Sequence, residues 1–328
     1  MPTSTSRVIP VAPGPARPAC ALGPLFLDVV MTGLEHAPRP GEEQWVSECA
    51  MMPGGCANQA VALARLGLPV LLRSSLGQDR AGALVRTMLE EEGIDLSACE
   101  STDRQNVTVS LAFDGDRAMT TVGSDAAPSL EGLGVVPSVL VTDLRAVAAN
   151  ESVVRDWRSG NAPTAVVGDV GWDDTGRWAP TDLQPLEHVD VFAPNKDEAL
   201  RYTRTETPIE AARILARRVP LVVVTCGADG VVACSTDEEI VLPATPQRPV
   251  DTTGAGDSFT AGLVRALAAG ASLRAALTLG SLTASRTVGL PGGSAAAPTL
   301  EEVRLHAASL DLPEDYDLSV LDLPTAHQ

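Results

Sequence analysis

The regular alternation of short β-type runs with Ala- and Leu-rich stretches of helical period constrains the fold most strongly. Strand patterns occur at residues 23–31, 70–75, 138–143, 164–170, 189–194, 221–226 and 230–235. Helix patterns occur at residues 56–67, 81–93, 209–219, 258–270 and 272–285. Such alternation is typical of parallel strands joined by helical crossovers. The sequence therefore predicts an α/β fold with a mostly parallel central sheet and helices on both faces.

Two other stretches do not fit this alternation. Residues 42–50, "EEQWVSECA", have a strand pattern, and so do residues 106–113 and 117–123. The last two are joined around an Asp-Gly pair, which is a strong hairpin signal. We expect these strands to form a small antiparallel β-sheet that acts as a lid beside a substrate cleft. An edge extension of the main sheet would give the same pattern.

The two ends of the chain differ in composition from its middle. Residues 1–20 are rich in proline and small residues, which predicts a disordered tail. Residues 311–328 are acidic and contain several prolines, which predicts a loosely attached tail. The folded domain between them spans residues 21–310, with lid strands from about 29–50 and 104–122.

Composition excludes several classes of function. The net charge is −18 and aromatic residues make up 3% of the 328 residues, which argues against nucleic-acid binding. No apolar run is long enough to cross a bilayer, so we expect no membrane partner. The single lysine, Lys196, follows Asn195, which excludes a Walker-type phosphate loop. The six cysteines form no CxxC pair, which favours reduced thiols and a cytoplasmic location.

The stretch "DTTGAGDSFTAG", residues 251–262, carries the clearest candidate site. Gly254, Ala255 and Gly256 precede a helix of apolar periodicity, so their N–H groups lie where a helix attracts anions. Asp257 falls in the first turn of that helix. A carboxylate beside an anion cradle can take a proton from a hydroxyl while the cradle neutralises a phosphoryl group. An ordinary helix cap is the alternative for this stretch taken alone.

The full string resembles the C-terminal signature of the ribokinase-like (PfkB-type) carbohydrate kinases. "GGCANQAVALARLG", residues 54–67, is similar to the family's N-terminal signature. "GPLFLDVV", "LGQDRAG", "PNKDE" and "TCGADG" match further family motifs, in family order, between about residues 21 and 300. The resemblance implies a ribokinase-like three-layer α/β/α sandwich with a small antiparallel β lid, Mg²⁺ and ATP as cofactors, and a homodimer formed through the lid.

The resemblance also implies roles for particular residues. Asp257 would be the catalytic base, and the N–H groups of the turn would form an anion hole for the transferred phosphoryl group. The residues that would bind sugar hydroxyls are Asp28, Gly54, Gly55 and Asn58. For Asn58 a helix-capping role is the plain alternative, whereas a lone carboxylate at position 28, inside an apolar strand, needs a partner.

The implied ATP contacts are Asn195, Thr225, Gly227, Gly230 and Ser281. Asn195 and Glu198 would organise Mg²⁺ through water, although both could simply shape the start of a helix. Asp251 and Thr253 would border a monovalent cation. The loop at residues 287–298 departs from the family pattern, with Leu290 in place of arginine and Gly293 in place of alanine. This departure leaves K⁺ dependence open.

We therefore expect an ATP-dependent kinase for a neutral sugar or related polyol. Arg104 is the lone basic residue near the expected cleft, which disfavours a substrate that is already phosphorylated. A nucleoside kinase of the same fold is an alternative, because Trp45, Met51, Met52 and Phe113 could stack on a base or simply pack. A non-catalytic sugar sensor is a further alternative, against which the intact motifs count. The glycine-rich motif lies too late in the chain for a Rossmann dehydrogenase.

Overall fold

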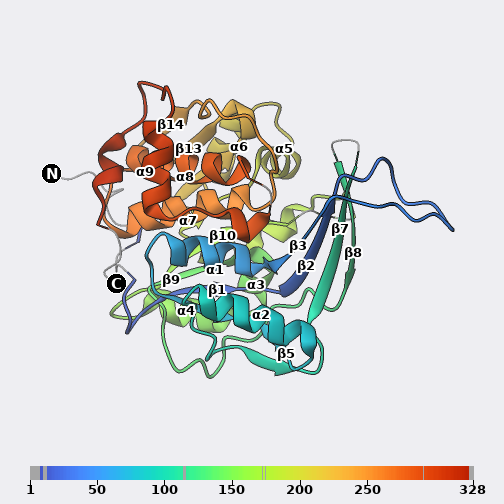
Figure 1. The fold of residues 1–328 in the computed structure, drawn as a ribbon. Helices are drawn as coiled ribbons and strands as arrows, with labels where there is room; N and C mark the ends of the chain where they lie inside the picture. The colour runs from blue at the N-terminus through green and yellow to red at the C-terminus, as the bar shows by residue number, and fades with distance from the viewer. Residues whose placement is uncertain are drawn as a thin grey trace.

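The computed structural model describes residues 8–9, 13–113, 116–171, 173, 175–290 and 292–324. Residues 1–7 and 10–12 of the predicted N-terminal tail, and residues 114–115 in the turn of the predicted hairpin, lie outside these residues. Figure 1 shows a body of sheet and helices from which a smaller sheet projects on one side. No helix among the described residues is both long and apolar enough to cross a membrane.

The body is built around an eight-stranded sheet in the order β14-β13-β12-β11-β10-β9-β1-β4. The five pairings from β12 to β4 are parallel, and the two that involve β13 are antiparallel. The strands are β1 (Ala19–Leu22), β4 (Val70–Arg73), β9 (Val139–Asp143), β10 (Ala165–Asp169), β11 (Val191–Phe192), β12 (Leu221–Thr225), β13 (Val231–Ser235) and β14 (Glu239–Leu242). The mostly parallel central sheet is confirmed.

Alternate residues of the sheet enter two separate hydrophobic cores, as the pleat of a strand requires. Ala19 and Ala21 of β1 belong to one core, whereas Cys20 and Leu22 belong to the other. The first core contains residues of α1 (Cys56–Arg65), α2 (Arg80–Glu91), α7 (Ala255–Ala268), α8 (Leu273–Val288) and α9 (Leu300–Ala308). The second contains residues of α3 (Leu144–Ala149), α4 (Glu151–Ser159), η2 (Pro180–His188), α5 (Lys196–Thr203) and α6 (Pro208–Leu215). The chain is therefore a three-layer α/β/α sandwich.

The helices α7 and α8 pack closely because glycine stands on each at their contact. A Cβ atom at Gly262 would lie 2.8 Å from the carbonyl oxygen of Leu279, and one at Gly280 would lie 3.0 Å from Phe259. Both helices are buried along most of their length. The first turn of α7, which carries Asp257, is thus held on a tightly packed helix pair.

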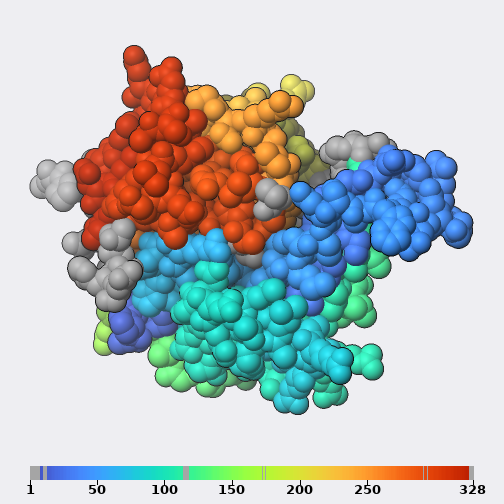
Figure 2. Space-filling view, in the orientation of Figure 1, coloured from blue at the N-terminus to red at the C-terminus, as the bar shows by residue number. Residues whose placement is uncertain are grey.

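The lid is a four-stranded sheet in the order β3-β2-β7-β8. Its strands are β2 (Leu25–Thr32), β3 (Glu48–Gly55), β7 (Asn106–Phe113) and β8 (Asp116–Val122). β7 and β8 pair as the predicted antiparallel hairpin, and β2 pairs antiparallel with β3 but parallel with β7. The lid and the segment 33–47 stand out from the body in Figure 2. A separate small sheet pairs β5 (Ser75–Gly77) with β6 (Glu100–Thr102).

The first strand differs from the prediction. Residues 23–31 were expected to be the first strand of the main sheet, but β2 belongs to the lid, and β1 (Ala19–Leu22) takes that place. β1 therefore begins inside the segment that was predicted to be a tail. The lid strand predicted at residues 42–50 begins only at Glu48 and continues to Gly55. β1 was missed because it has only four residues, Ala-Cys-Ala-Leu, and because the stretch before it is rich in proline.

The end of the chain also differs from the expected loose attachment. Tyr316 and Val320 are buried in the first core, and η5 (Leu318–Asp322) is a short 3-10 helix. Arg265 donates to the carbonyl oxygen of Pro324 at 2.7 Å, and Arg304 donates to that of Leu321 at 2.8 Å. Residues 311–324 are therefore held against the body. Residues 325–328 lie outside the described part of the chain.

Replacing Val320 by alanine tests this attachment. Val320 is 1% exposed and Leu318, in the same short helix, is 44% exposed. We expect Val320→Ala to lower the free energy of unfolding by about 1–3 kcal/mol, because it leaves a cavity. Leu318→Ala, the matched control, should change it by less than about 0.5 kcal/mol. Equal effects in urea denaturation would show that the segment does not contribute to the core.

Candidate functional site

The turn before α7 is open toward solvent and is suited to bind an anion. Gly254 is the N-cap residue with a φ of 72°, and no side chain caps the helix. The first bond within the helix runs from the N–H of Ser258 to the carbonyl oxygen of Gly254, so the N–H groups of Gly256 and Asp257 precede it. The N–H of Ala255 makes a long bond of 3.3 Å to Thr252. The turn therefore presents main-chain donors in the field of the helix dipole.

The carboxyl group of Asp257 lies against the first turns of α1. The side chains of Asn58 and Gln59 both hydrogen-bond to it. Burial raises the pKa of Asp257 to about 6, while these two hydrogen bonds act in the opposite direction. The two signature stretches, some 200 residues apart in the sequence, therefore meet at one carboxylate.

The candidate sugar residues gather where the lid joins α1. Asp28 on β2 pairs with Met52 on β3, and a Cβ atom at Gly54 would lie 1.9 Å from Asp28 Oδ2. Only glycine therefore leaves room for the carboxylate. Gly55 has a φ of 65° and turns the chain from β3 into α1. A Cβ atom at Gly293 would lie 3.5 Å from Asn58 Oδ1 and 3.6 Å from Met52 Sδ, so the loop at Gly293 adjoins both residues.

Asn195 and Glu198 form a capping box at the start of α5. Asn195 Oδ1 accepts from the N–H of Glu198 at 3.0 Å, and Glu198 Oε2 accepts from the N–H of Asn195 at 2.8 Å. The plain helix-capping role is therefore present. Glu198 is 7% exposed, and burial raises its pKa to about 7. A nearly buried carboxylate of this kind gains from a cation, so the pair fits a hydrated Mg²⁺.

A cavity of about 270 Å³ lies between the turn of α7, α8 and the end of β12. Phe259, Ala284 and Val288 give it apolar walls, and Ala255 and Gly256 form one end. Four of the residues predicted to contact ATP line it: Thr225, Gly227, Gly230 and Ser281. Asn195 lies beside Thr225 through an isolated β-bridge. The structure thus brings the predicted nucleotide residues to one cavity that reaches the turn.

Lys196, the single lysine of the chain, forms an ion pair across the candidate site. Its Nζ forms an ion pair with Asp229 Oδ2 at 2.8 Å. Asp229 belongs to the "TCGADG" turn, whereas Lys196 begins α5. The pair therefore fastens the nucleotide turn to the helix that carries Glu198. Because both side chains are exposed, we give the ion pair little weight in stability.

Asp251 ties the turn of α7 to the loop that follows α8. Its Oδ1 accepts from the N–H of Thr253 at 2.9 Å, and its Oδ2 accepts from that of Gly292 at 3.0 Å. A Cβ atom at Gly254 would lie 3.3 Å from the Cα of Gly293. The loop that departs from the family pattern is thus packed directly against the turn before α7.

Asp169, which the sequence patterns did not single out, lies next to this site. Asp169 ends β10, and the parallel register places it beside Asp143 at the end of β9. Gln59 Nε2 donates to Asp169 Oδ2 at 3.4 Å. Burial, and then the charges of Asp257, Asp143 and Glu198, raise the pKa of Asp169 well above its usual range. The sequence shows a carboxylate at the end of a predicted strand. Its position near α7 depends on the order of the strands in the sheet, which the sequence pattern does not contain.

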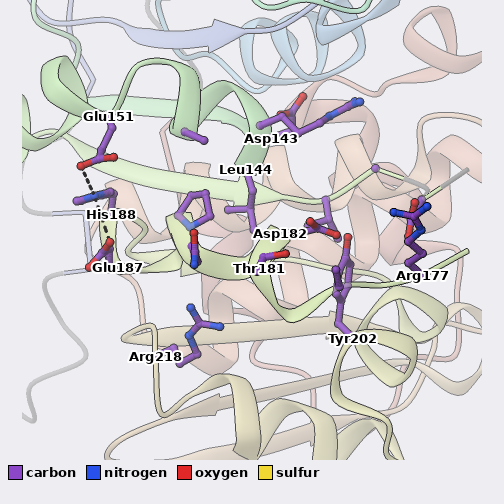
Figure 3. A pocket seen from close by; sticks show the side chains of 18 of the residues that line it. Asp143, Leu144, Glu151, Arg177, Thr181, Asp182, Glu187, His188, Tyr202 and Arg218 are labelled. Carbon is purple, nitrogen blue, oxygen red and sulfur yellow. Dashed lines mark ion pairs between the residues drawn. The ribbon is translucent and has the colours of Figure 1, made fainter. Parts of the chain in front are cut away.

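A larger cavity of about 1110 Å³ lies on the other face of the sheet, between α3 and η2. Figure 3 shows Arg218, Asp182 and Tyr202 on its walls, with His188 between Glu151 and Glu187. It contains none of the predicted site residues. We therefore assign the candidate site to the turn of α7, where the motif residues meet.

Comparison with known proteins agrees with this assignment. The model of the pfkB family carbohydrate kinases matches residues 19–300. The chain belongs to the pfkB family of carbohydrate kinases. The family prediction is confirmed, and so is the predicted activity at the level of an ATP-dependent carbohydrate kinase.

Individual pfkB relatives cover nearly the whole chain. The ribokinase of Bacillus subtilis is 29% identical over 298 residues, which are 88% of this chain and 98% of the relative. The nucleoside kinase of Methanothermobacter thermautotrophicus is 28% identical over 277 residues, 82% of this chain and 88% of the relative. The ribokinase of Arabidopsis thaliana, solved with ribose and ATP, superimposes with a TM-score of 0.73 at 23% identity, covering 94% of this chain and 100% of that one. The ribokinase fold is thereby confirmed.

The raised pKa of Asp257 can be measured without substrate. We expect the carboxyl carbon of Asp257, followed by NMR in ¹³C-aspartate-labelled protein, to titrate near pH 6, because burial disfavours the charged form. Asp257→Asn assigns the resonance. Asn58→Ala should move the midpoint to higher pH, since it removes a donor to the carboxylate. A midpoint at the ordinary aspartate value of about 3.9 would contradict the described environment.

Proposed function

We propose that this pfkB kinase transfers the γ-phosphoryl group of ATP to a hydroxymethyl group of a neutral sugar or related polyol. The observation that carries the proposal is the position of Asp257. Its carboxyl group lies beside the N-terminus of α7, with the cavity of about 270 Å³ on one side and the Asp28–Asn58 region on the other. The candidate base, the candidate anion cradle and the two candidate binding regions are therefore adjacent.

In this proposal Asp257 accepts the proton of the hydroxymethyl group as its oxygen attacks the γ-phosphorus. The bond from that phosphorus to the β,γ-bridging oxygen breaks, and ADP leaves with the electron pair. The N–H groups of the turn formed by Gly254, Ala255 and Gly256 stabilise the charge on the transferred group. Gly256 supplies the most open donor, because the N–H of Ala255 also bonds to Thr252. The pKa of about 6 leaves Asp257 mostly ionised at pH 7, as a base must be.

The sugar-binding roles of Asp28, Gly54, Gly55 and Asn58 rest on their shared location. A carboxylate and a carboxamide suit hydroxyl groups as acceptor and donor. The neutral substrate is favoured because Arg104, which precedes lid strand β7, is exposed. Met52 is 4% exposed and therefore offers no open surface on which a base could stack. Its burial favours a sugar over a nucleoside. A nucleoside remains the second candidate substrate, because the relative from Methanothermobacter thermautotrophicus is a nucleoside kinase.

Asn195 and Glu198 would hold Mg²⁺ through its bound water. A ribokinase II of E. coli with the same fold was solved with ATP and Mg²⁺. The capping box uses Glu198 Oε2, so Oε1 is the oxygen that would accept a hydrogen bond from a metal-bound water. Bound Mg²⁺ would supply charge neutralisation on the phosphates. Asp251 and Thr253 would border a monovalent cation, for which the adjoining Gly292–Gly293 backbone offers further ligands.

The outer face of the lid supports a homodimer. Met51, Val109 and Val122 lie on the face opposite to Asp28, and they are 51%, 36% and 68% exposed. An apolar sheet face of this kind is covered by association in many proteins, and a second copy of the lid presents the same surface.

The six cysteines, none of which forms a disulfide, fit the predicted cytoplasmic location.

The kinase assignment is tested with a substrate panel. Pentoses, hexoses, keto-deoxy acids and nucleosides should be screened for ADP release with Mg²⁺, in K⁺ and in Na⁺. Asp257→Asn should lower kcat on the best substrate by about 10³-fold or more, because the base is lost, and should leave ATP affinity nearly unchanged. Asp311→Asn, an exposed change of the same charge, is the control. Turnover by Asp257→Asn at the wild-type rate would refute the role of the base.

The dimer is tested on the outer face of the lid. We expect Val122→Asp to convert a dimer into a monomer in light scattering, since it places a charge in an apolar interface. Val241→Asp, at an exposed position of β14, should leave the mass unchanged. A wild-type protein that is monomeric at micromolar concentrations would contradict the proposed homodimer.

A further inference from the structure

The proposed function leaves one buried side chain of α1 unexplained. Gln59 is 7% exposed and follows Asn58 directly. Its carboxamide hydrogen-bonds to Asp257 on α7, and its Nε2 donates to Asp169 Oδ2 on β10 at 3.4 Å. One amide group therefore joins the candidate base to the end of a central strand.

The chemistry of a carboxamide fits this double contact. Its nitrogen carries two N–H groups, so it can donate one to each of two carboxyl groups. A buried amide also needs partners for its polar atoms, because unpaired ones are costly. Rotation of the Gln59 side chain would break both contacts. The Asp257 carboxyl group is thus oriented from α1 by Asn58 and Gln59, and Gln59 is itself held by Asp169.

Three acidic groups face Asp169: Asp257 from α7, Asp143 from β9 and Glu198 from α5. Their charges, after burial itself, raise the pKa of Asp169 well above its usual range. The donor on Gln59 acts on Asp257 in the other direction, since it lowers the pKa of that carboxyl group.

We propose that Gln59 and Asp169 are positioning residues for the proton transfer: Asp169 fixes the carboxamide of Gln59, and Gln59 fixes the carboxylate of Asp257. Neither residue touches the reacting atoms. This inference rests on the proposed role of Asp257 as base. It assigns to the end of β10 a part in catalysis that neither of the two family signatures contains.

Gln59→Met tests the first contact, because methionine has a similar shape but no donor. We expect kcat to fall by about 10- to 100-fold, since a base that is misplaced by an ångström loses rate on this scale. KM for ATP should change little. The acid limb of the kcat–pH profile should move to higher pH, because a hydrogen bond to the ionised form is lost. A profile and a kcat equal to those of wild type would overturn the proposal.

Asp169→Leu tests the second contact, because leucine is of similar size but cannot accept the hydrogen bond from Gln59. Asp169→Asn, whose amide oxygen can still accept it, is the conservative variant and should keep most of the activity. The acid limb of Asp169→Leu should move to higher pH, as in Gln59→Met, because the donor to Asp257 is no longer held in place. In ¹³C-aspartate-labelled protein without substrates, the Asp257 carboxyl midpoint should shift to higher pH in both Gln59→Met and Asp169→Leu. Unchanged midpoints in both variants would exclude the network even if activity changed.

Gln105→Met is the matched control. Gln105 is 4% exposed and donates to the carbonyl oxygen of Leu25 at 2.7 Å, away from Asp257. It should lower the melting temperature but keep the acid limb in place. Asp257→Asn separates the two levels of the proposal. If that variant is inactive while Gln59→Met matches wild type, the network is wrong and the base stands. If Asp257→Asn remains active, the proposed base fails first.

Discussion

The contact between the first turns of α1 and α7 is the interaction on which the rest of the site depends. It places Asn58 and Gln59 against Asp257, and it lets the anion-binding turn open beside the candidate sugar residues. The contact is possible because both helices start at glycines with positive φ, Gly55 and Gly254. Buried packing of α7 on α8 keeps the turn rigid. A helix N-terminus held in this way offers donors to a phosphoryl group without reorganisation.

The second constraint is electrostatic. A chain of net charge −18 must bind a polyphosphate, and in the proposed site main-chain N–H groups and a helix dipole take the place of basic side chains. Glu198 is buried, Asp257 and Asp169 are partly buried, and the pKa values of all three are raised. Each of these groups would be stabilised as a carboxylate by a nearby cation. The proposed Mg²⁺ is therefore consistent with the acidity of the site as well as with the phosphates.

Part of the molecule could be predicted from sequence because the signals were local. The Gly-Ala-Gly-Asp turn, the hairpin at β7 and β8, and the periodic helices α1, α2, α7 and α8 all have short-range patterns. The position of β2 could not be predicted in this way. Its strand pattern was correct, but whether a strand joins the main sheet or the lid depends on its partners. β1 and the C-terminal segment were missed because burial of small or scattered apolar residues leaves little periodicity.

By itself the sequence determined the α/β class through its hydrophobic periods, and it determined the family and the motif residues through their resemblance to the carbohydrate-kinase signatures. Only the tertiary structure decided which of those residues share a place. Asp28 and Gly54 come from adjacent lid strands, Asp257 and Asn58 from helices some 200 residues apart, and Asp169 from the end of a central strand. Contacts between distant segments depend on strand order and helix packing, which no local pattern encodes. For that reason Gln59 and Asp169 became visible only when α1, α7 and β10 were seen together.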